Sequence, residues 1–223
     1  MDDLGKAFTF PFHQREWGVK IFIGSLFLLL CVVGLGIPVV AGYTVRVCQR
    51  VMRKEEELLP EWSDIGVLFV TGVKYIVVYM LYQLPIILLM IPLLFLAAAG
   101  AMVDLTDTAA LVLGVYFFGF MLLAIPYSLL FTLLLPVITY RFAINEKITD
   151  GLDIACVFKE FRLQWASATV VAILAVVVEI LSLLGILLFF VGVLATLLYS
   201  YLVFAALSGF LYRGAHAPAG AKV

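Results

Sequence analysis

Residues 163–212 read LQWASATVVAILAVVVEILSLLGILLFFVGVLATLLYSYLVFAALSGFLY, fifty residues in which Glu179 is the single charged side chain. A membrane-spanning helix needs about 20 apolar residues, because each residue rises about 1.5 Å and the hydrocarbon core is about 30 Å thick. The stretch is therefore long enough for two spans. Gly185 and Gly192 bracket the expected turn, since glycine is typical of turns. These residues predict a membrane hairpin.

The composition of the whole chain agrees with a membrane protein. Of 223 residues, 65% are hydrophobic and 13% are charged, and the mean hydropathy is +1.18. Soluble globular domains are about 45–50% apolar and about 25% charged, so this chain has more apolar surface than one soluble core can bury. The net charge of −1 excludes nucleic acid as a main partner, because phosphate binding needs clustered lysine and arginine. The expected surroundings are a lipid bilayer.

Three further apolar blocks cover residues 21–45, 75–103 and 108–140. The last two are separated by the short acidic segment Asp104 to Asp107, which predicts a second hairpin. The first block has two interpretations. Its 25 residues could form one span, whereas the Gly34 to Pro38 segment in its middle has the composition of a turn and predicts a short hairpin.

The basic residues favour the hairpin. With it, all fourteen lysines and arginines lie on one side of the membrane, as the positive-inside rule expects. A single span would instead leave Lys6, Arg15 and Lys20 on the outer side. We therefore expect six transmembrane helices in three hairpins, with both termini cytoplasmic.

A short string precedes each hairpin: Asp, Leu or Ile, Gly or Ala, two residues, then Phe. It begins at Asp3, Asp64 and Asp153, and Trp or Tyr follows each copy. Aromatic side chains anchor at membrane interfaces, so each string predicts a short interfacial amphipathic helix. The alternative is chance similarity in a chain rich in Phe and Leu. The six expected interfacial anchors are Phe8, Trp17, Phe69, Tyr75, Phe158 and Trp165.

The expected organisation is an all-α integral membrane protein with a single multi-pass domain over residues 1–213. Approximate repeats cover residues 1–62, 63–149 and 150–213. Each repeat would supply one interfacial helix and one hairpin, and a flexible tail would follow over residues 214–223.

One segment carries a resemblance to a known family. Leu59, Pro60, Glu61 and Trp62 are followed by Asp64, Gly66, Phe69, Gly72 and Lys74, and preceded by Gly42, Tyr43 and the acidic run Glu55 to Glu57. This pattern resembles a prokaryotic membrane family known as domain of unknown function 4013, over most of the chain from about Phe8 to Arg213. The resemblance implies a multi-pass membrane protein of bacteria or archaea, and it implies no activity and no catalytic residues.

Two candidate sites follow from the residues themselves. Glu179 lies roughly 20 Å into a span that starts near Ala166, and ionisable groups at that depth are rare and often functional. It is a candidate ion site, or a neutral acid that is hydrogen-bonded to a neighbouring helix. The Leu59, Pro60, Glu61, Trp62 segment is either a structural loop or a docking surface for a partner.

We find no catalytic constellation, metal-ligand spacing or cofactor motif, so we expect neither an enzyme nor a cofactor. Cys31, Cys48 and Cys156 are scattered and read as packing residues. The favoured function is a non-catalytic scaffold, assembly factor or accessory subunit of a membrane complex, with a membrane-protein partner or a second copy of the chain. The alternative is a small proton- or ion-coupled transporter that uses Glu179.

Overall fold

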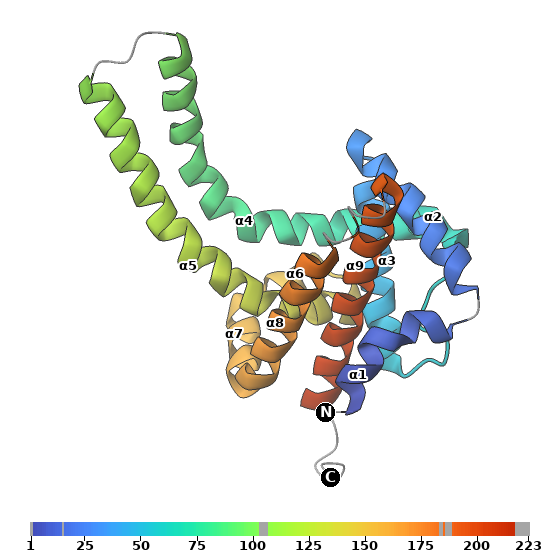
Figure 1. The fold of residues 1–223 in the computed structure, drawn as a ribbon. Helices are drawn as coiled ribbons and strands as arrows, with labels where there is room; N and C mark the ends of the chain where they lie inside the picture. Colours follow the sequence, from blue (N-terminus) through green and yellow to red (C-terminus); the bar gives the residue numbers. More distant parts are fainter. Residues whose placement is uncertain (1, 15, 103–106, 183–184, 186–188, 217–223) are drawn as a thin grey trace. The chain divides into compact units, whose positions relative to one another are not determined.

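The fold is a set of helices, seen in a computed structural model that describes residues 2–14, 16–102, 107–182, 185 and 189–216 (Figure 1). Within these ranges all regular secondary structure is helical. The α-helices are α1 (Asp2–Thr9), α2 (Trp17–Leu29), α3 (Gly36–Arg53), α4 (Ile65–Met102), α5 (Asp107–Asn145), α6 (Ile148–Leu152), α7 (Ile154–Leu163), α8 (Trp165–Ser182) and α9 (Phe189–Ala215). Three short 3₁₀ helices are η1 (Phe10–His13), η2 (Leu30–Val33) and η3 (Trp62–Asp64).

The chain forms two compact units. The first comprises residues 1–78 and 133–223, and the second comprises residues 79–132. The second unit pairs the later part of α4 with the earlier part of α5. There the Tyr116 hydroxyl donates to the Leu89 carbonyl at 2.9 Å, and the Tyr127 hydroxyl donates to the Tyr82 carbonyl. These half-buried tyrosines thus satisfy their hydroxyl groups on the backbone of the partner helix.

Helix α9 forms the core of the first unit. It packs against α3, α8, α2 and α1, and it lies between α8 and α3 in Figure 1. Leu202, Ala205 and Ala206 are almost fully buried on it. A Cβ at Gly209 would lie 2.8 Å from Cβ of Val51, so the missing side chain lets α9 approach α3 closely.

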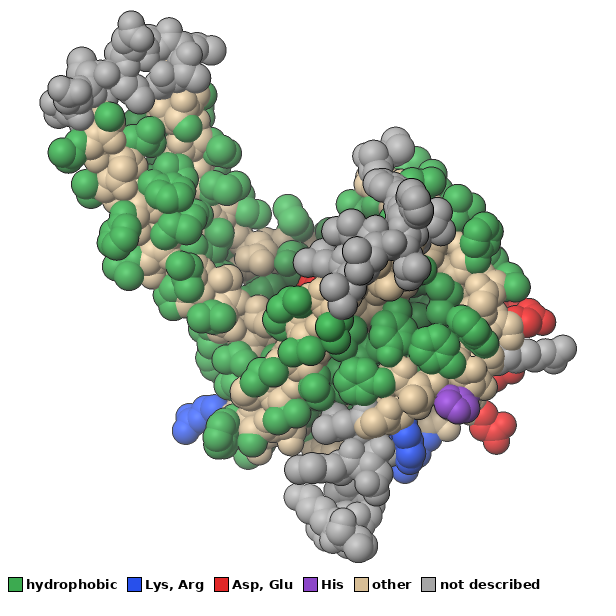
Figure 2. All heavy atoms as spheres, viewed as in Figure 1, with side chains coloured by type: hydrophobic (Ala, Val, Ile, Leu, Met, Phe, Trp, Pro, Cys, Tyr) green, Lys and Arg blue, Asp and Glu red, His purple; other side chains and the backbone are tan. Residues whose placement is uncertain are grey.

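Among the described residues, four helices are long and apolar enough to cross a membrane: residues 62–99, 110–145, 165–182 and 192–215. They belong to the predicted second and third hairpins. On the face seen in Figure 2, hydrophobic side chains cover α8 and the second unit. Large apolar side chains such as Ile173, Val177 and Ile180 are exposed on α8. Such surfaces are stable in contact with lipid and costly in water.

The first predicted hairpin is shorter. The helix over residues 21–45 breaks at Gly34, whose φ of 82° is accessible to glycine, and α2 and η2 lie before the break while α3 follows it. The residues therefore do not form one continuous helix. Helix α2 has 13 residues, about 20 Å at 1.5 Å each, which is short of the bilayer core. The six-span arrangement stays a prediction.

The three repeated strings differ in structure. Asp3 lies in α1, and Asp153 caps α7 by accepting a hydrogen bond from the Cys156 backbone N–H at 3.0 Å. The second string forms no separate helix. Asp64 ends η3, and the residues after it continue directly into α4 because no proline interrupts them before Pro85. The prediction of a separate amphipathic helix ahead of each hairpin is therefore wrong for the second copy.

Parts of the predicted organisation lie outside the described residues. These are Asp104 to Thr106 in the second turn, residues 183–184 and 186–188 of the third turn, and residues 217–223 of the tail. Helix α9 extends to Ala215, two residues past the expected start of the tail.

Candidate functional site

The loop between α3 and η3 begins with a left-handed residue. Lys54 has φ 59°, and the backbone N–H of Glu55 returns to the Arg50 carbonyl at 3.0 Å, which closes the last turn of α3. The loop then runs back along α3 toward α4. It places an acidic segment opposite the basic end of the helix.

The Leu59 to Trp62 segment is built into the protein. Leu59 is fully buried, and its carbonyl accepts a hydrogen bond from Lys20 Nζ at 3.0 Å. The Trp62 ring stacks on Tyr43 with centroids 4.0 Å apart, and its Nε1 donates to the Lys20 carbonyl at 3.0 Å. The Tyr43 hydroxyl donates to the Pro60 carbonyl at 3.0 Å. These contacts favour the structural interpretation, because the apolar members face inward.

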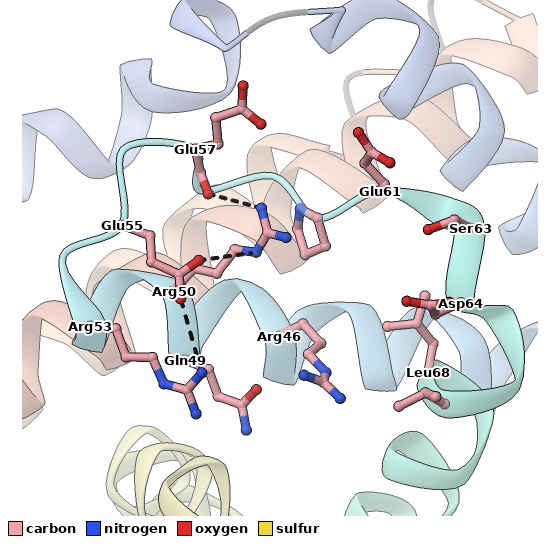
Figure 3. Close-up of a pocket in the computed structure, with 12 residues that line it drawn as sticks. Arg46, Gln49, Arg50, Arg53, Glu55, Glu57, Glu61, Ser63, Asp64 and Leu68 are labelled. Atoms are coloured by element: carbon pink, nitrogen blue, oxygen red, sulfur yellow. Dashed lines mark hydrogen bonds and ion pairs between the residues drawn. The ribbon is translucent and has the colours of Figure 1, made fainter.

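A pocket of about 440 Å³ lies between this loop, the last turns of α3 and the first turns of α4 (Figure 3). Basic residues come from α3: Arg46, Arg50 and Arg53. Acidic residues come from the loop and η3: Glu55, Glu57, Glu61 and Asp64. Val67 and Leu68 of α4 supply an apolar edge. The pocket therefore has positive, negative and apolar walls within one unit of the protein.

Arg50 and Arg53 differ in the contacts that they make within the protein. Arg50 pairs with Glu55 at 3.5 Å and donates to the carbonyls of Glu57 at 3.0 Å and Leu59 at 3.3 Å, so it holds the loop on α3. Arg53 reaches Glu55 only at 4.0 Å, and its side chain is 63% exposed. Its guanidinium keeps donors for a ligand, since arginine carries five N–H groups.

Three carboxylates around the pocket lack a cation. Glu57, Glu61 and Asp64 are exposed, and none forms an ion pair with a residue that the structure describes. In Figure 3 the Glu57 and Glu61 side chains point away from α3, and the Arg46 and Arg53 side chains point away from the loop. These acidic and basic side chains therefore lie on opposite sides of the pocket lining.

Behind the arginine wall lies a buried polar cluster centred on Glu146. Its carboxylate accepts hydrogen bonds from the Thr71 hydroxyl at 2.7 Å and from Gln49 Nε2 at 2.9 Å, and it pairs with Arg46 at 3.6 Å. The backbone of Glu146 is left-handed, with φ 54°, directly after α5 ends. This residue therefore ties α3, α4 and the end of α5 together.

The charge of Glu146 is stabilised by these neighbours. Burial alone would raise the pKa of its carboxyl. The hydrogen bonds from Thr71 and Gln49, together with the positive charges of Arg46 and Lys74, outweigh burial and hold that pKa below the ordinary range of glutamate. Glu146 is therefore ionised at neutral pH.

Gln49 connects the cluster to the pocket. Its Nε2 donates to the Ala143 carbonyl at 2.8 Å and to Glu146, which fixes the orientation of the amide because both neighbours are acceptors. Its Oε1 is buried and has no donor among the described residues. The side chain also lines the pocket, between Arg46 and Arg53 (Figure 3). The arginine wall therefore contains an unused acceptor.

Pro60 and Glu61 of the predicted segment line this pocket, whereas its basic residues were not predicted as part of a site. Arg46, Gln49, Arg50 and Arg53 stand at positions i, i+3, i+4 and i+7, a pattern that places them on one side of a helix and could have singled out α3. No sequence signal joins them to Glu146, which lies almost a hundred residues later.

A second polar cluster surrounds Arg141, near the end of α5. Arg141 pairs with Glu160 of α7 at 2.5 Å and donates to the Asp150 carbonyl at 3.2 Å. Tyr140 donates to the same Glu160 carboxylate and accepts from Gln164 Nε2 at 2.6 Å. The cluster holds α6 and α7 against α5.

Glu179 lies away from both clusters. It is exposed on α8, and its side chain has no hydrogen bond or ion pair with the described residues. Its backbone carbonyl accepts the Ser182 hydroxyl at 2.6 Å. It lines neither the pocket above nor a second pocket of about 460 Å³ between the N-terminal segment, α3 and α9.

The predicted interfacial anchors differ in their surroundings. Trp17, Phe69, Phe158 and Trp165 are exposed. Phe8 is half-buried, and its carbonyl accepts the Tyr199 hydroxyl at 2.8 Å. The remaining member is Tyr75, whose hydroxyl shares a hydrogen bond with Thr139 at 2.8 Å, so this ring joins α4 to α5.

Within the described residues, no group of three or more His, Cys, Asp and Glu side chains is placed to hold a metal ion. The pocket lining carries side chains of both charges.

The helices and the charged pocket at the start of α4 define a helical protein suited to a lipid membrane. The chain belongs to the family described as protein of unknown function (DUF4013), whose sequence model matches residues 25–184. This match confirms the resemblance drawn from the Leu59 to Trp62 segment, which lies inside it. No curated protein and no solved structure matches the chain.

Proposed function

We propose that this chain is a non-catalytic membrane protein that serves as a scaffold, assembly factor or accessory subunit of a membrane complex. The observation that supports the proposal is the position of Glu179 on the exposed apolar face of α8. Its neighbours on that face are Ile173, Val176 and Ile180, all exposed. A carboxyl group among lipid-facing side chains needs a hydrogen-bonding partner, because lipid offers none at that depth.

A second membrane helix is the partner that fits this face. Helices associate in lipid through interhelical hydrogen bonds from polar side chains, and a carboxyl group can both donate and accept when it is protonated. Glu179 lies 14 residues after Trp165, about 21 Å along α8, so the donor must come from within the bilayer. A subunit of a complex or a second copy of this chain could supply it.

The transporter alternative needs Glu179 to line a water-filled path. Glu179 lines neither of the two pockets described above. An accessory role needs only the exposed face and its one acid.

For topology, we propose six spans in the inner membrane of a prokaryote, with both termini cytoplasmic. Support comes from the break at Gly34 and from the fourteen basic residues on one side in that arrangement. A single cysteine at position 56, in a chain without its native cysteines, should resist an impermeant maleimide added outside intact cells. Strong labelling from outside would contradict the topology.

The partner is tested by purifying the tagged full chain from native membranes in a mild detergent. We expect the wild type to elute as a stoichiometric complex, identified by mass spectrometry and light scattering. Glu179→Leu should release the partner, whereas Glu179→Gln should retain it because the amide still donates and accepts. Glu56→Leu is the control, since Glu56 is an exposed acid outside the spans. A monomeric wild type would contradict the proposal.

A further inference from the structure

The pocket of Figure 3 lies at the start of the candidate membrane span of α4. The candidate span of α4 begins at Trp62, so Ser63 and Asp64, which line the pocket, belong to its first turn. At that point a spanning helix leaves the headgroup region and enters the hydrocarbon core. The ligand that is always present beside such a pocket is a phospholipid.

An apolar strip continues from the pocket along α4. Val67 lines the pocket and is exposed, and Val70, Val73 and Val77 follow it as exposed residues on the same helix. A headgroup in the pocket would therefore have a surface on which its acyl chains could pack. A soluble polar ligand would gain nothing from this strip.

The charges select the kind of headgroup. Four carboxylates and three guanidiniums line the pocket, and the carboxylates of Glu57, Glu61 and Asp64 have no cationic partner in the described part of the chain. A purely anionic ligand would satisfy Arg46 and Arg53 but would be repelled by these acids. A ligand with a phosphate at one end and an ammonium at the other satisfies both walls.

The acidic residues favour a cation that carries hydrogen-bond donors. Carboxylate oxygens are acceptors, and Asp64 and Glu61 both line the pocket. A primary ammonium can give them three N–H donors, whereas a quaternary ammonium has none. Charge-assisted hydrogen bonds of this kind are stronger than neutral ones.

From these observations we infer that the pocket binds the phosphoethanolamine headgroup of a phospholipid. The phosphate lies against Arg53 and Arg46, and the primary ammonium lies against Asp64, Glu61 and Glu57. The glycerol end leaves over Val67 toward the apolar strip of α4. The pocket volume of about 440 Å³ falls within the range of about 300–1,000 Å³ that is usual for small-ligand sites.

The test uses the full chain, delipidated in detergent and titrated with short-chain phospholipids of identical acyl chains. Lipid-bound protein is counted by native mass spectrometry. We expect phosphatidylethanolamine to bind at least about tenfold more tightly than phosphatidylcholine, which lacks N–H donors, and than phosphatidylglycerol, which lacks the cation. Glycerophosphoethanolamine, which has the same headgroup and no acyl chains, should bind at least about tenfold more weakly than the lipid.

Two variants test whether the lipid binds in this pocket. Asp64→Asn combined with Glu61→Gln removes two negative charges from the ammonium wall and should reduce phosphatidylethanolamine binding about tenfold or more, with phosphatidylglycerol binding raised. Glu56→Gln is the matched control, because Glu56 belongs to the same exposed loop but does not line the pocket. It should leave both lipids unaffected.

Several results would overturn the inference. Equal binding of phosphatidylethanolamine and phosphatidylcholine would remove the role of the ammonium donors. Equal binding of the lipid and of glycerophosphoethanolamine would point to a soluble ligand. If the double variant does not fold, the lipid series on the wild type still decides, and Arg53→Gln, on the exposed end of α3, tests the phosphate wall separately. None of these results depends on a complex formed through Glu179.

Discussion

The indole ring of Trp62 lies flat on the phenol ring of Tyr43, with ring centroids 4.0 Å apart and planes inclined by 9°. The two residues come from η3 and α3, and each also donates a hydrogen bond to a backbone carbonyl, Trp62 to Lys20 and Tyr43 to Pro60. One stacked pair thus joins α2, α3 and the loop that borders the pocket. Stacking of this kind adds about 0.5–1.5 kcal/mol beyond the burial of the rings.

Removal of the Trp62 ring should destabilise the protein strongly. We expect Trp62→Ala to lower the free energy of unfolding by up to about 3–5 kcal/mol, the cost for a fully buried aromatic side chain, because the Trp62 ring is half-buried. Trp62→Phe keeps a stacked ring and loses the hydrogen bond to Lys20, at a cost of about 0.5–1.5 kcal/mol beyond its smaller size. The measurement is thermal unfolding of the detergent-solubilised protein. Trp165→Ala, at a side chain that is 64% exposed, is the control and should change little.

The crossing of α3 and α4 depends on glycine. A Cβ on Gly72 would lie 1.7 Å from the carbonyl oxygen of Pro38, and backbone atoms cannot yield to it. We expect Gly72→Ala to destabilise the protein by about 1–3 kcal/mol, because the helices must separate. Gly66→Ala, on the same helix with no atom within 4 Å, should be neutral or stabilising by up to about 1 kcal/mol. Equal melting temperatures for the two variants would contradict this close contact.

The charge of Glu146 predicts a loss of stability in acid. Its pKa in the folded protein is held below that of an ordinary glutamate, so its contribution is complete above the unfolded value, about 4.3, and is lost as the pH falls through the folded pKa. Glu146→Gln should therefore be less stable than wild type at neutral pH. The gap between the two should narrow below about pH 4. If the difference in free energy of unfolding between wild type and Glu146→Gln stays constant from pH 7 to pH 3, the lowered pKa of Glu146 is refuted.

The placement of α6 and α7 should depend on Arg141. Its side chain is 15% exposed and pairs with Glu160, so Arg141→Gln leaves a half-buried carboxylate without its cation. We expect a loss of about 1–3 kcal/mol in unfolding free energy and faster amide hydrogen exchange in α7. Arg162→Gln, at an exposed arginine near the end of α7, should alter neither quantity.

Hydropathy and turn composition were sufficient to predict part of this architecture. The second and third hairpins correspond to helices that are long and apolar enough to cross a bilayer, and the break at Gly34 falls inside the predicted turn. Both signals are local, since they depend on the transfer of each side chain into lipid or on the backbone freedom of glycine. The Leu59 to Trp62 segment was also sufficient to identify the family.

The sequence pattern led to a wrong prediction at the second of the three repeated strings, the one that begins at Asp64. The residues after Asp64 match the amphipathic strings at Asp3 and Asp153, yet they form the first turns of α4. Whether such a string forms a separate helix depends on where the next helix-breaking residue lies. Here the next proline is Pro85, about twenty residues later. The hydrogen bond of the Tyr75 hydroxyl to Thr139 across two helices was not predicted, and the place of Tyr75 at the membrane interface stays a prediction.

Spacing along the chain was enough to indicate an all-helical membrane protein, its family and the isolated acid at Glu179, because each follows from short-range patterns of polarity. The Glu146 cluster required the folded structure, since it joins α3 to residues almost a hundred positions later. The pocket required it as well, because the return of the loop along α3 brings its residues together. Hydrogen bonds and ion pairs act over a few ångströms in space, whatever the separation in sequence. Which of the many charged residues meet is therefore settled by helix packing, here by the close approach of α3 and α4 at Gly72.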